Sequence, residues 1–111
     1  MSKSKPTNQP DWQPVRPEIS NGISGKLLVA APMKTVLTKV EPGGVFQLHR
    51  DHYGHLFHIL SGEGRFTVEG EDYHLTAGMS LQIQAGALHG YENCGEEELL
   101  LISVNRPVEH L

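Results

Sequence analysis

Residues 43–64 read GGVFQLHRDHYGHLFHILSGEG and contain four of the chain's seven histidines. Short runs of aliphatic, aromatic and β-branched residues are separated by glycines, which is typical of β-strands joined by tight turns. Histidine is the commonest side-chain ligand of protein-bound metal ions. The stretch therefore predicts neighbouring strands that carry a candidate metal site.

The same pattern of short apolar runs continues from Lys26 to Val104. Glycine-containing turns interrupt it every eight to twelve residues or so, which is too often for long helices. Eight or nine short strands in one small domain predict an all-β jelly-roll barrel, also called a double-stranded β-helix, in which two sheets enclose one core. The expected strands cover residues 26–31, 33–40, 45–50, 56–60, 64–69, 72–75, 79–84, 88–93 and 98–104.

The beginning of the chain has a different composition. Residues 1–24 hold four of the seven prolines and show little apolar periodicity, so we expect an N-terminal extended arm there and the β-barrel domain over residues 25–111. Trp12 is the one large ring in this arm, and such a ring usually lies against another surface. It either packs on its own barrel or is exchanged with a partner subunit.

Composition excludes some classes of function. The chain of 111 residues has 9 basic and 13 acidic side chains and no cluster of lysine or arginine, which argues against a nucleic-acid interface. It has no apolar run of the ~20 residues that a membrane span needs. A single cysteine, Cys94, permits no internal disulfide, as expected in a reducing compartment. We therefore expect a cytoplasmic protein that binds neither nucleic acid nor membrane.

Strand alternation predicts which side chains face inward, because residues two apart on a strand share a face. It places Gln47, His49 and Asp51 together, with Phe46 and Leu48 on the opposite face. Two ligands of one metal ion must lie side by side in this way. Several strands, such as residues 99–104, are apolar on both faces, which indicates an outer surface covered by the arm or by another subunit. A homodimer is our expectation.

The opening stretch resembles the first conserved motif of the cupin superfamily, which reads glycine, five residues, His-x-His, three or four residues, glutamate, six residues, glycine. Counting from Gly43 places His49 on the first histidine of the motif and Asp51 on the second. His55 then falls on the glutamate and Gly62 on the closing glycine. The spacing is kept, although two ligand types differ.

Residues 78–93 resemble the second cupin motif, which reads glycine, five residues, Pro-x-Gly, two residues, histidine, three residues, asparagine. Gly78, Gly86, His89 and Asn93 match it, and Gln84 stands where the motif has proline. Together the two motifs imply a jelly-roll barrel with one metal ion. A histidine in place of the motif's glutamate is similar to the small single-domain manganese cupins with four histidines.

The resemblance implies that His49, Asp51, His55 and His89 bind one divalent ion. Counting favours Asp51 over His52, but a bulge before the turn would present His52 instead, so either residue can be the fourth ligand. Imidazole and carboxylate donors suit Mn, Fe, Ni, Cu or Zn better than Mg or Ca. The resemblance favours Mn or Fe.

Other inward positions are candidates for a substrate pocket. Phe57 and Phe66 can wall it, although inward apolar residues more often form plain core. Tyr91 shares a face with His89 and carries a hydroxyl that can meet a substrate. Gln47 can orient a ligand or line the pocket. No residue can be named as a catalytic acid or base.

A fold does not fix a reaction, so two functions on a small molecule remain open beside a third possibility, a purely structural metal site with a closed shell of four ligands. The first is a metal-dependent oxygenase, isomerase or lyase that acts on a small polar or carbonyl molecule. The second is a module that binds a sugar or an acid without catalysis, because residues 57–68 are also similar to the effector-binding barrels of arabinose-type regulators. Both predict a small-molecule partner.

Overall fold

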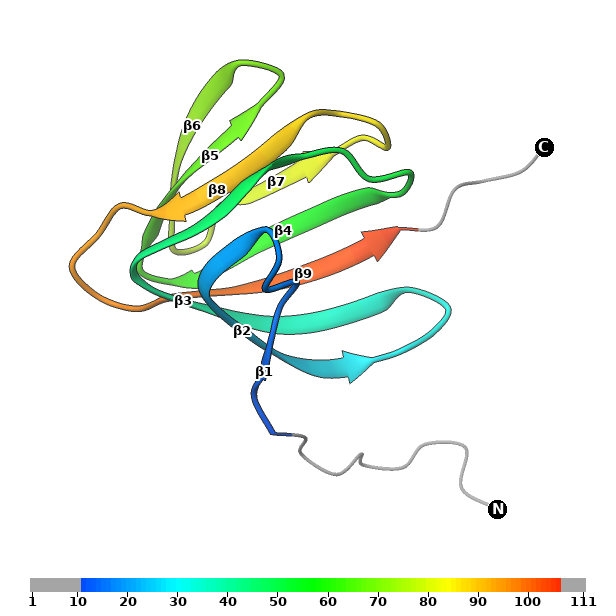
Figure 1. The fold of residues 1–111 in the computed structure, drawn as a ribbon, viewed down its shortest axis with the longest axis horizontal. Helices are drawn as coiled ribbons and strands as arrows, with labels where there is room; N and C mark the ends of the chain where they lie inside the picture. The colour runs from blue at the N-terminus through cyan, green and yellow to red at the C-terminus, as the bar shows by residue number, and fades with distance from the viewer. Residues whose placement is uncertain (1–10, 107–111) are drawn as a thin grey trace.

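The computed structural model describes residues 11–106, which form an all-β fold (Figure 1). The predicted jelly-roll class is confirmed. The strands are β1 (Gln13–Pro14), β2 (Ser20–Val29), β3 (Lys34–His49), β4 (Gly54–Ser61), β5 (Glu63–Val68), β6 (Glu71–Thr76), β7 (Ser80–Ile83), β8 (His89–Asn93) and β9 (Leu99–Arg106).

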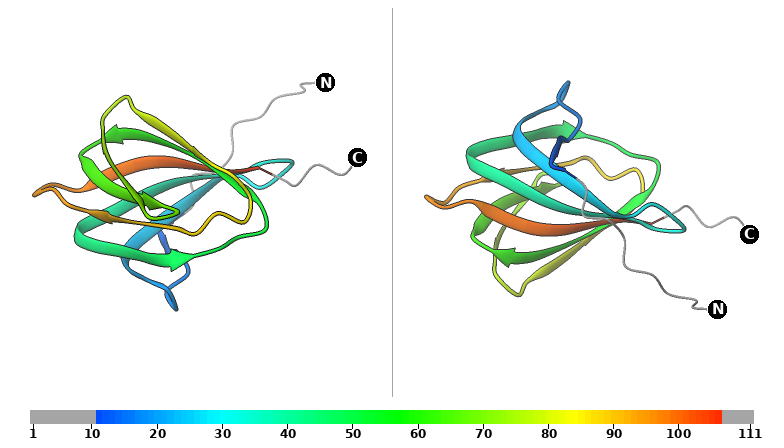
Figure 2. Two further views of the ribbon diagram at one scale, coloured as in Figure 1. Left: turned by 90° about the horizontal axis from the view of Figure 1, so that it is seen from above. Right: turned by 90° about the horizontal axis from the view of Figure 1, so that it is seen from below.

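The strands pair antiparallel in the order β6-β5-β8-β3-β9-β4-β7, and β2 pairs with both β3 and β1. The two views in Figure 2 show that this sheet folds over into two facing layers. One layer holds β5, β6 and β8, and the other holds β4, β7 and β9. A folded sheet of this kind has an interior that is open at its ends, where a ligand can enter.

Strand β3 belongs to both layers. Its residues 34–40 pair with β9, and its residues 45–49 pair with β8. Between these halves lies the Glu41-Pro42-Gly43-Gly44 segment, which the strand pattern marks as a turn but which the structure makes a bend within one strand. A Cβ on Gly44 would lie 2.7 Å from Val40 Cγ1 and 2.9 Å from the Glu41 carbonyl oxygen. Only glycine therefore permits this bend, where the strand passes from one sheet to the other.

Aromatic and aliphatic side chains from both layers fill the interior. Those with the least exposure are Phe66, Ile59, Ile83, Leu99, Leu101 and Val40. Phe66 packs on Tyr91 and Phe57, with ring centroids 4.8 and 5.5 Å apart. Phe57 also stacks on His55, and Ile83 is paired with His55, so this core continues directly into the end of the barrel that holds the histidines.

The start of the described chain is part of the sheet. Strand β1 and the first residues of β2 lie inside the range 1–24 that we expected to be an arm, while residues 1–10 lie outside the described part. Trp12 packs on its own barrel, with the Lys26 and Lys39 ammonium groups 4.8 and 4.3 Å from its ring. The segment that follows Trp12 is thereby fixed against β2 and β3.

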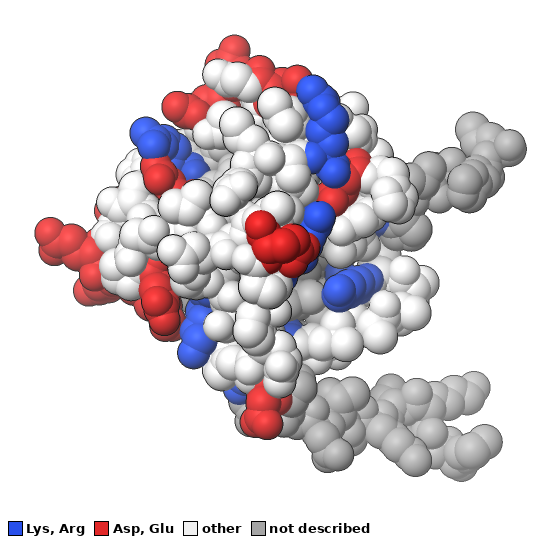
Figure 3. Space-filling view, in the orientation of Figure 1, with Lys and Arg blue, Asp and Glu red and all other residues white. Residues whose placement is uncertain are grey.

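Charged side chains are unevenly distributed over the surface. Figure 3 shows acidic groups gathered at the end where the β8–β9 loop lies, and that loop contains Glu96, Glu97 and Glu98. On the face in view, lysines and arginines lie singly among acidic and uncharged residues. Among residues 11–106 we find no helix with the length and apolar character needed to span a membrane.

Candidate metal centre

Three histidines meet at one end of the barrel, although they are distant in sequence. His49 ends β3, His55 lies near the start of β4, and His89 begins β8. His49 and His89 are paired across β3 and β8, with ring centroids 4.4 Å apart, and the His55 ring lies 4.8 Å from that of His89. His55 and His89 are buried, and His49 is half-buried.

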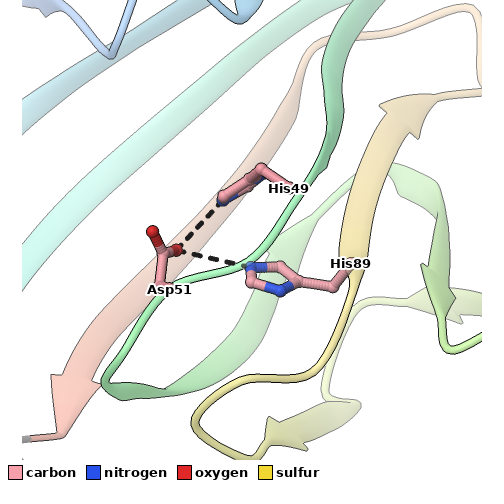
Figure 4. Close-up of side chains that lie close together, drawn as sticks. All are labelled: His49, Asp51 and His89. Carbon is pink, nitrogen blue, oxygen red and sulfur yellow. Dashed lines mark hydrogen bonds and ion pairs between the residues drawn. The ribbon is translucent and has the colours of Figure 1, made fainter.

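The buried carboxylate of Asp51 points towards His49 and His89 (Figure 4), and it also contacts His55. Its Oδ2 atom is 2.8 Å from Nε2 of His55, 3.0 Å from Nε2 of His49 and 3.7 Å from Nε2 of His89. Ligand atoms of His49, Asp51 and His89 lie within 4.8 Å of one another, and His55, in contact with Asp51, is a fourth potential donor.

Each imidazole has its other nitrogen bound to a carbonyl oxygen. Nδ1 of His49 lies 2.8 Å from the backbone oxygen of Gln47, and Nδ1 of His89 lies 2.8 Å from that of Ala87. Nδ1 of His55 lies 3.1 Å from Oδ1 of Asn105. Because a carbonyl oxygen only accepts hydrogen bonds, each Nδ1 carries the proton. Each Nε2 is then left as the ligand atom, which is how proteins orient metal-binding histidines.

This donor set fits a divalent first-row ion. The ionised Asp51 oxygen and the Nε2 atoms of His49 and His55 can lie this close only with a positive charge between them, either a proton on Nε2 or a metal ion in its place. Neighbouring donors held about 2.1 Å from one such ion lie roughly 3.0 to 3.4 Å apart, and the distances from Asp51 Oδ2 span 2.8 to 3.7 Å. Burial lowers the pKa of His89, so this ring resists taking up a proton. A proton on His89 therefore cannot easily supply the positive charge that a metal ion would bring.

The structure brings Asp51, and not His52, to the histidines. Side chains alternate along the extended segment that follows His49, so Asp51 points inward and its neighbour points outward. The His52 side chain is exposed and packs edge-on against Tyr53, with ring centroids 5.5 Å apart.

Arg16 is a site residue that the sequence pattern did not reveal. Its Nη1 atom donates a hydrogen bond to Oδ1 of Asp51 over 2.9 Å. Burial raises the pKa of the Asp51 carboxyl, but its contacts with His55 and Arg16 outweigh burial, and the pKa lies below its ordinary value. Asp51 is therefore ionised at neutral pH, with one oxygen held by Arg16 and the other facing the histidines.

A cavity of about 330 Å³ opens directly beside the centre. Phe46, Phe57 and Tyr91 line its apolar wall, and Thr38 and Ser103 add hydroxyl groups. Residues 11 and 13–16 line it from the N-terminal side. This volume lies within the range of small-molecule sites, roughly 300 to 1,000 Å³.

Two of the four expected pocket residues line this cavity and two do not. Phe57 and Tyr91 line it. Phe66 lies one layer deeper, fully buried behind Tyr91, because alternation predicts the inward face of a strand but not the depth along the barrel. Gln47 has an exposed side chain and contributes its carbonyl oxygen to His49 instead.

A β-bulge explains why Phe46 takes the inward place expected for Gln47. Phe46 is paired with Tyr91 and His49 with His89, so three steps along β3 match two steps along β8. The extra residue puts Phe46 on the same face as His49, and their rings stack with centroids 4.7 Å apart. The bulge also turns the Gln47 carbonyl towards the His49 ring.

The lowered pKa of His89 predicts how the stability of the metal-free protein depends on pH. Burial causes the shift, with smaller contributions from His55 and His49. A histidine whose folded pKa lies below 6.5 stabilises the fold fully above pH 6.5 and progressively less as pH falls towards the folded value. The melting temperature of EDTA-treated protein should therefore fall between about pH 7 and about pH 5. His89→Asn should make the melting temperature depend less on pH. An unchanged dependence would show that His89 is not the group responsible.

Comparisons with known proteins agree with the fold. The family model of the cupin domain matches residues 36–105. The polyketide cyclase RemF of Streptomyces resistomycificus has a similar structure, with a TM-score of 0.79, 19% identity, and coverage of 97% of this chain and 82% of that one. A predicted oxalate decarboxylase of Thermotoga maritima has a TM-score of 0.73 and 25% identity, covering 78% of this chain and 81% of that one.

Two curated proteins are similar in sequence over part of their length. The transcriptional regulator PuuR of Escherichia coli is 31% identical over 93 residues, which is 79% of this chain and 50% of the regulator. A mannose-1-phosphate guanylyltransferase of Klebsiella pneumoniae is 36% identical over 66 residues, covering 59% of this chain and 14% of that enzyme. The chain thus spans half or less of these relatives. The family match over residues 36–105, together with the jelly-roll fold, shows that the chain belongs to the cupin domain family.

Proposed function

We propose that the protein is a metal-dependent enzyme that acts on a small polar or carbonyl molecule. One observation carries this proposal: three histidines with anchored Nδ1 atoms turn their Nε2 atoms towards one ionised carboxylate beside a cavity of about 330 Å³. His49, Asp51, His55 and His89 would hold one divalent ion, with Mn or Fe favoured over Ni, Cu and Zn. Such an ion supplies a Lewis acid or a redox centre.

The chain's own residues would prepare the substrate. Phe46 and Phe57 exclude water from one wall of the cavity, which strengthens polar interactions inside it. The buried Thr38 hydroxyl and the Tyr91 ring also line the cavity. Burial raises the pKa of Tyr91, so its hydroxyl keeps its proton at neutral pH and can donate it to an oxygen of the substrate.

The proposal is tested first by metal content and then by turnover. Protein purified without chelators should contain about one Mn or Fe per chain, measured by inductively coupled plasma mass spectrometry. The loaded protein is then incubated with a panel of small keto acids, hydroxy acids and sugars, and their consumption is followed by NMR. Product formed by wild-type protein but not by His49→Ala supports an enzyme. Protein that takes up none of the five metals rejects the proposal.

A second candidate is a sensor module that binds its ligand without changing it. The similarity to the regulator PuuR over 79% of this chain favours this alternative. The same panel of keto acids, hydroxy acids and sugars distinguishes the enzyme from the sensor. A compound that raises the melting temperature and is recovered unchanged supports the sensor.

Substitution of Asp51 tests its role as the fourth donor. Asp51→Asn keeps an oxygen near Arg16 but removes the negatively charged donor, so we expect Mn²⁺ to bind more than about 100-fold more weakly, beyond the effect of an outer partner of a metal ligand. Calorimetric titration measures the change. His52→Asn is the matched control and should bind Mn²⁺ like wild type. Weaker Mn²⁺ binding by His52→Asn, together with wild-type binding by Asp51→Asn, would make His52 the ligand.

The expected homodimer and the cytoplasmic location stay predictions. Leu27, Val29 and Met33 near the β2–β3 turn are 46%, 45% and 45% exposed, which supports a contact between two copies at this hairpin. Sedimentation at micromolar concentration should show a dimer, and Leu27→Lys should weaken it. A monomer at all concentrations would reject the dimer.

A further inference from the structure

The tight turn between β5 and β6 carries an unexpected residue. Val68 and Glu71 are paired, so Glu69 and Gly70 form a two-residue turn, and both have positive φ, +47° and +82°. Turns of this type favour asparagine, aspartate or glycine at the first position, because a longer side chain is strained there. A glutamate that departs from this preference indicates that its side chain has a role.

The Glu69 side chain reaches the loop that precedes His89. Its Oε1 atom accepts hydrogen bonds from the Leu88 amide over 2.7 Å and from Arg50 Nη1 over 3.0 Å. The Glu69 amide donates to the Leu88 carbonyl oxygen over 2.8 Å. The same Nη1 of Arg50 donates to the Gly86 carbonyl oxygen over 2.7 Å. We call Arg50 and Glu69 the clasp, because together they hold residues 86–88.

The loop held by the clasp touches two of the candidate metal ligands. The Gly86 amide donates to the Asp51 carbonyl oxygen over 2.7 Å. The Ala87 carbonyl oxygen accepts the hydrogen bond that orients His89, over 2.8 Å. Each of these groups is within one residue of an atom that the clasp binds, so movement of the loop would turn His89 and displace the backbone of Asp51.

We propose that Arg50 and Glu69 are positioning residues that orient His89 and Asp51 for metal binding. This role rests on the proposed function, since it requires a metal ion at the centre. The clasp side chains are 58% and 54% exposed, and exposed ion pairs add little to stability. Outer partners of metal ligands, in contrast, typically change metal affinity 10- to 100-fold. The clasp acts on the ligands through the loop, so we expect its loss to weaken metal binding by about 10-fold, the lower end of this range.

The test uses Co²⁺ as the probe and two variants of opposite charge. Arg50→Gln removes a positive charge, and Glu69→Asn removes a negative one. A purely electrostatic influence on the cation would make the first variant bind Co²⁺ more tightly and the second more weakly. A positioning role predicts that both bind about 10-fold more weakly, with a changed visible absorption spectrum of the bound Co²⁺.

Asparagine at position 69 also separates positioning from folding. It suits the turn better than glutamate but is too short to keep the clasp contacts. The melting temperature of metal-free Glu69→Asn should therefore equal or exceed that of wild type while its affinity for Co²⁺ falls. Arg65 and Glu92, an exposed ion pair between β5 and β8, provide the controls. Arg65→Gln and Glu92→Gln should leave the affinity and the spectrum unchanged.

The outcomes separate this inference from the proposed function. Wild-type protein that binds Co²⁺ alongside clasp variants with unchanged affinity and spectrum overturns the clasp alone. Opposite shifts in the two variants, or equal losses in the Arg65 and Glu92 controls, also overturn it. Wild-type protein that binds neither Co²⁺ nor any of the five metals named above overturns the proposed function and the clasp together.

Discussion

Replacing His89 with asparagine should abolish the rise in melting temperature that Mn²⁺ gives the wild-type protein. The His89 side chain is 97% buried, its Nδ1 is anchored, and its Nε2 faces Asp51. Free metal at 100 times its dissociation constant stabilises a fold by about 2.7 kcal/mol, which for a domain of this size raises the melting temperature by roughly 10 °C. Loss of a ligand should weaken binding more than about 100-fold, beyond the effect of an outer partner, so this rise disappears.

The control for this experiment is His74, which is exposed on β6 and contacts Glu63. His74→Asn should keep the full metal-dependent rise in melting temperature. Circular dichroism of each metal-free variant verifies the fold, so a loss of metal binding is not mistaken for unfolding. A His89→Asn protein that still gains the wild-type increase would remove His89 from the metal centre.

The resemblance to the two cupin motifs selected the candidate ligands, because motif spacing counts residues and is insensitive to local irregularity. The four candidates are His49, Asp51, His55 and His89, and the structure puts all four side chains at one end of the barrel. The choice between Asp51 and its neighbour followed from the same count. Motif spacing does not determine which strands pair. The meeting of these four side chains depends on that pairing.

Alternation along a strand failed where β3 bulges. It predicted an inward Gln47 and an outward Phe46, and the structure has the reverse. A bulge shifts every earlier residue to the other face, and no feature of the local run of side chains marks its position. The signal lies on the neighbouring strand, at Gly90, where a glycine within a strand indicates the close approach of another backbone.

Arg16 shows a second limit of reasoning from sequence. It lies 35 residues before Asp51, in a proline-rich segment without periodicity and outside the part of the chain that matches the family model. Its φ of +42° places it in a turn after β1, and the pairing of β1 with β2 brings it to the centre. Such a contact between distant segments follows from tertiary structure alone.

Gly90 connects the fold to the metal centre, because it lies where β8 meets the bulge of β3. A Cβ at this position would lie 2.6 Å from the Phe46 carbonyl oxygen, 3.0 Å from the Leu48 amide nitrogen and 3.1 Å from the Gln47 carbonyl carbon. All three are backbone atoms, so a rotamer change cannot relieve the contact. Its φ is not positive, which means that glycine is needed here for space and not for backbone conformation.

Gly90→Ala should therefore destabilise the protein by about 3 kcal/mol, at the upper end of the usual cost of overpacking, and weaken metal binding as well. The methyl group would push the bulge away from β8 and carry with it the Gln47 carbonyl that orients His49. Urea unfolding measures the first effect, and titration with Mn²⁺ measures the second. Gly95→Ala is the control, because its Cβ would meet the flexible Glu63 side chain, 2.8 Å from Cγ, and should cost less than about 1 kcal/mol. Equal stability of the two variants would show that the bulge adjusts freely, and His49 would then not depend on Gly90 for its orientation.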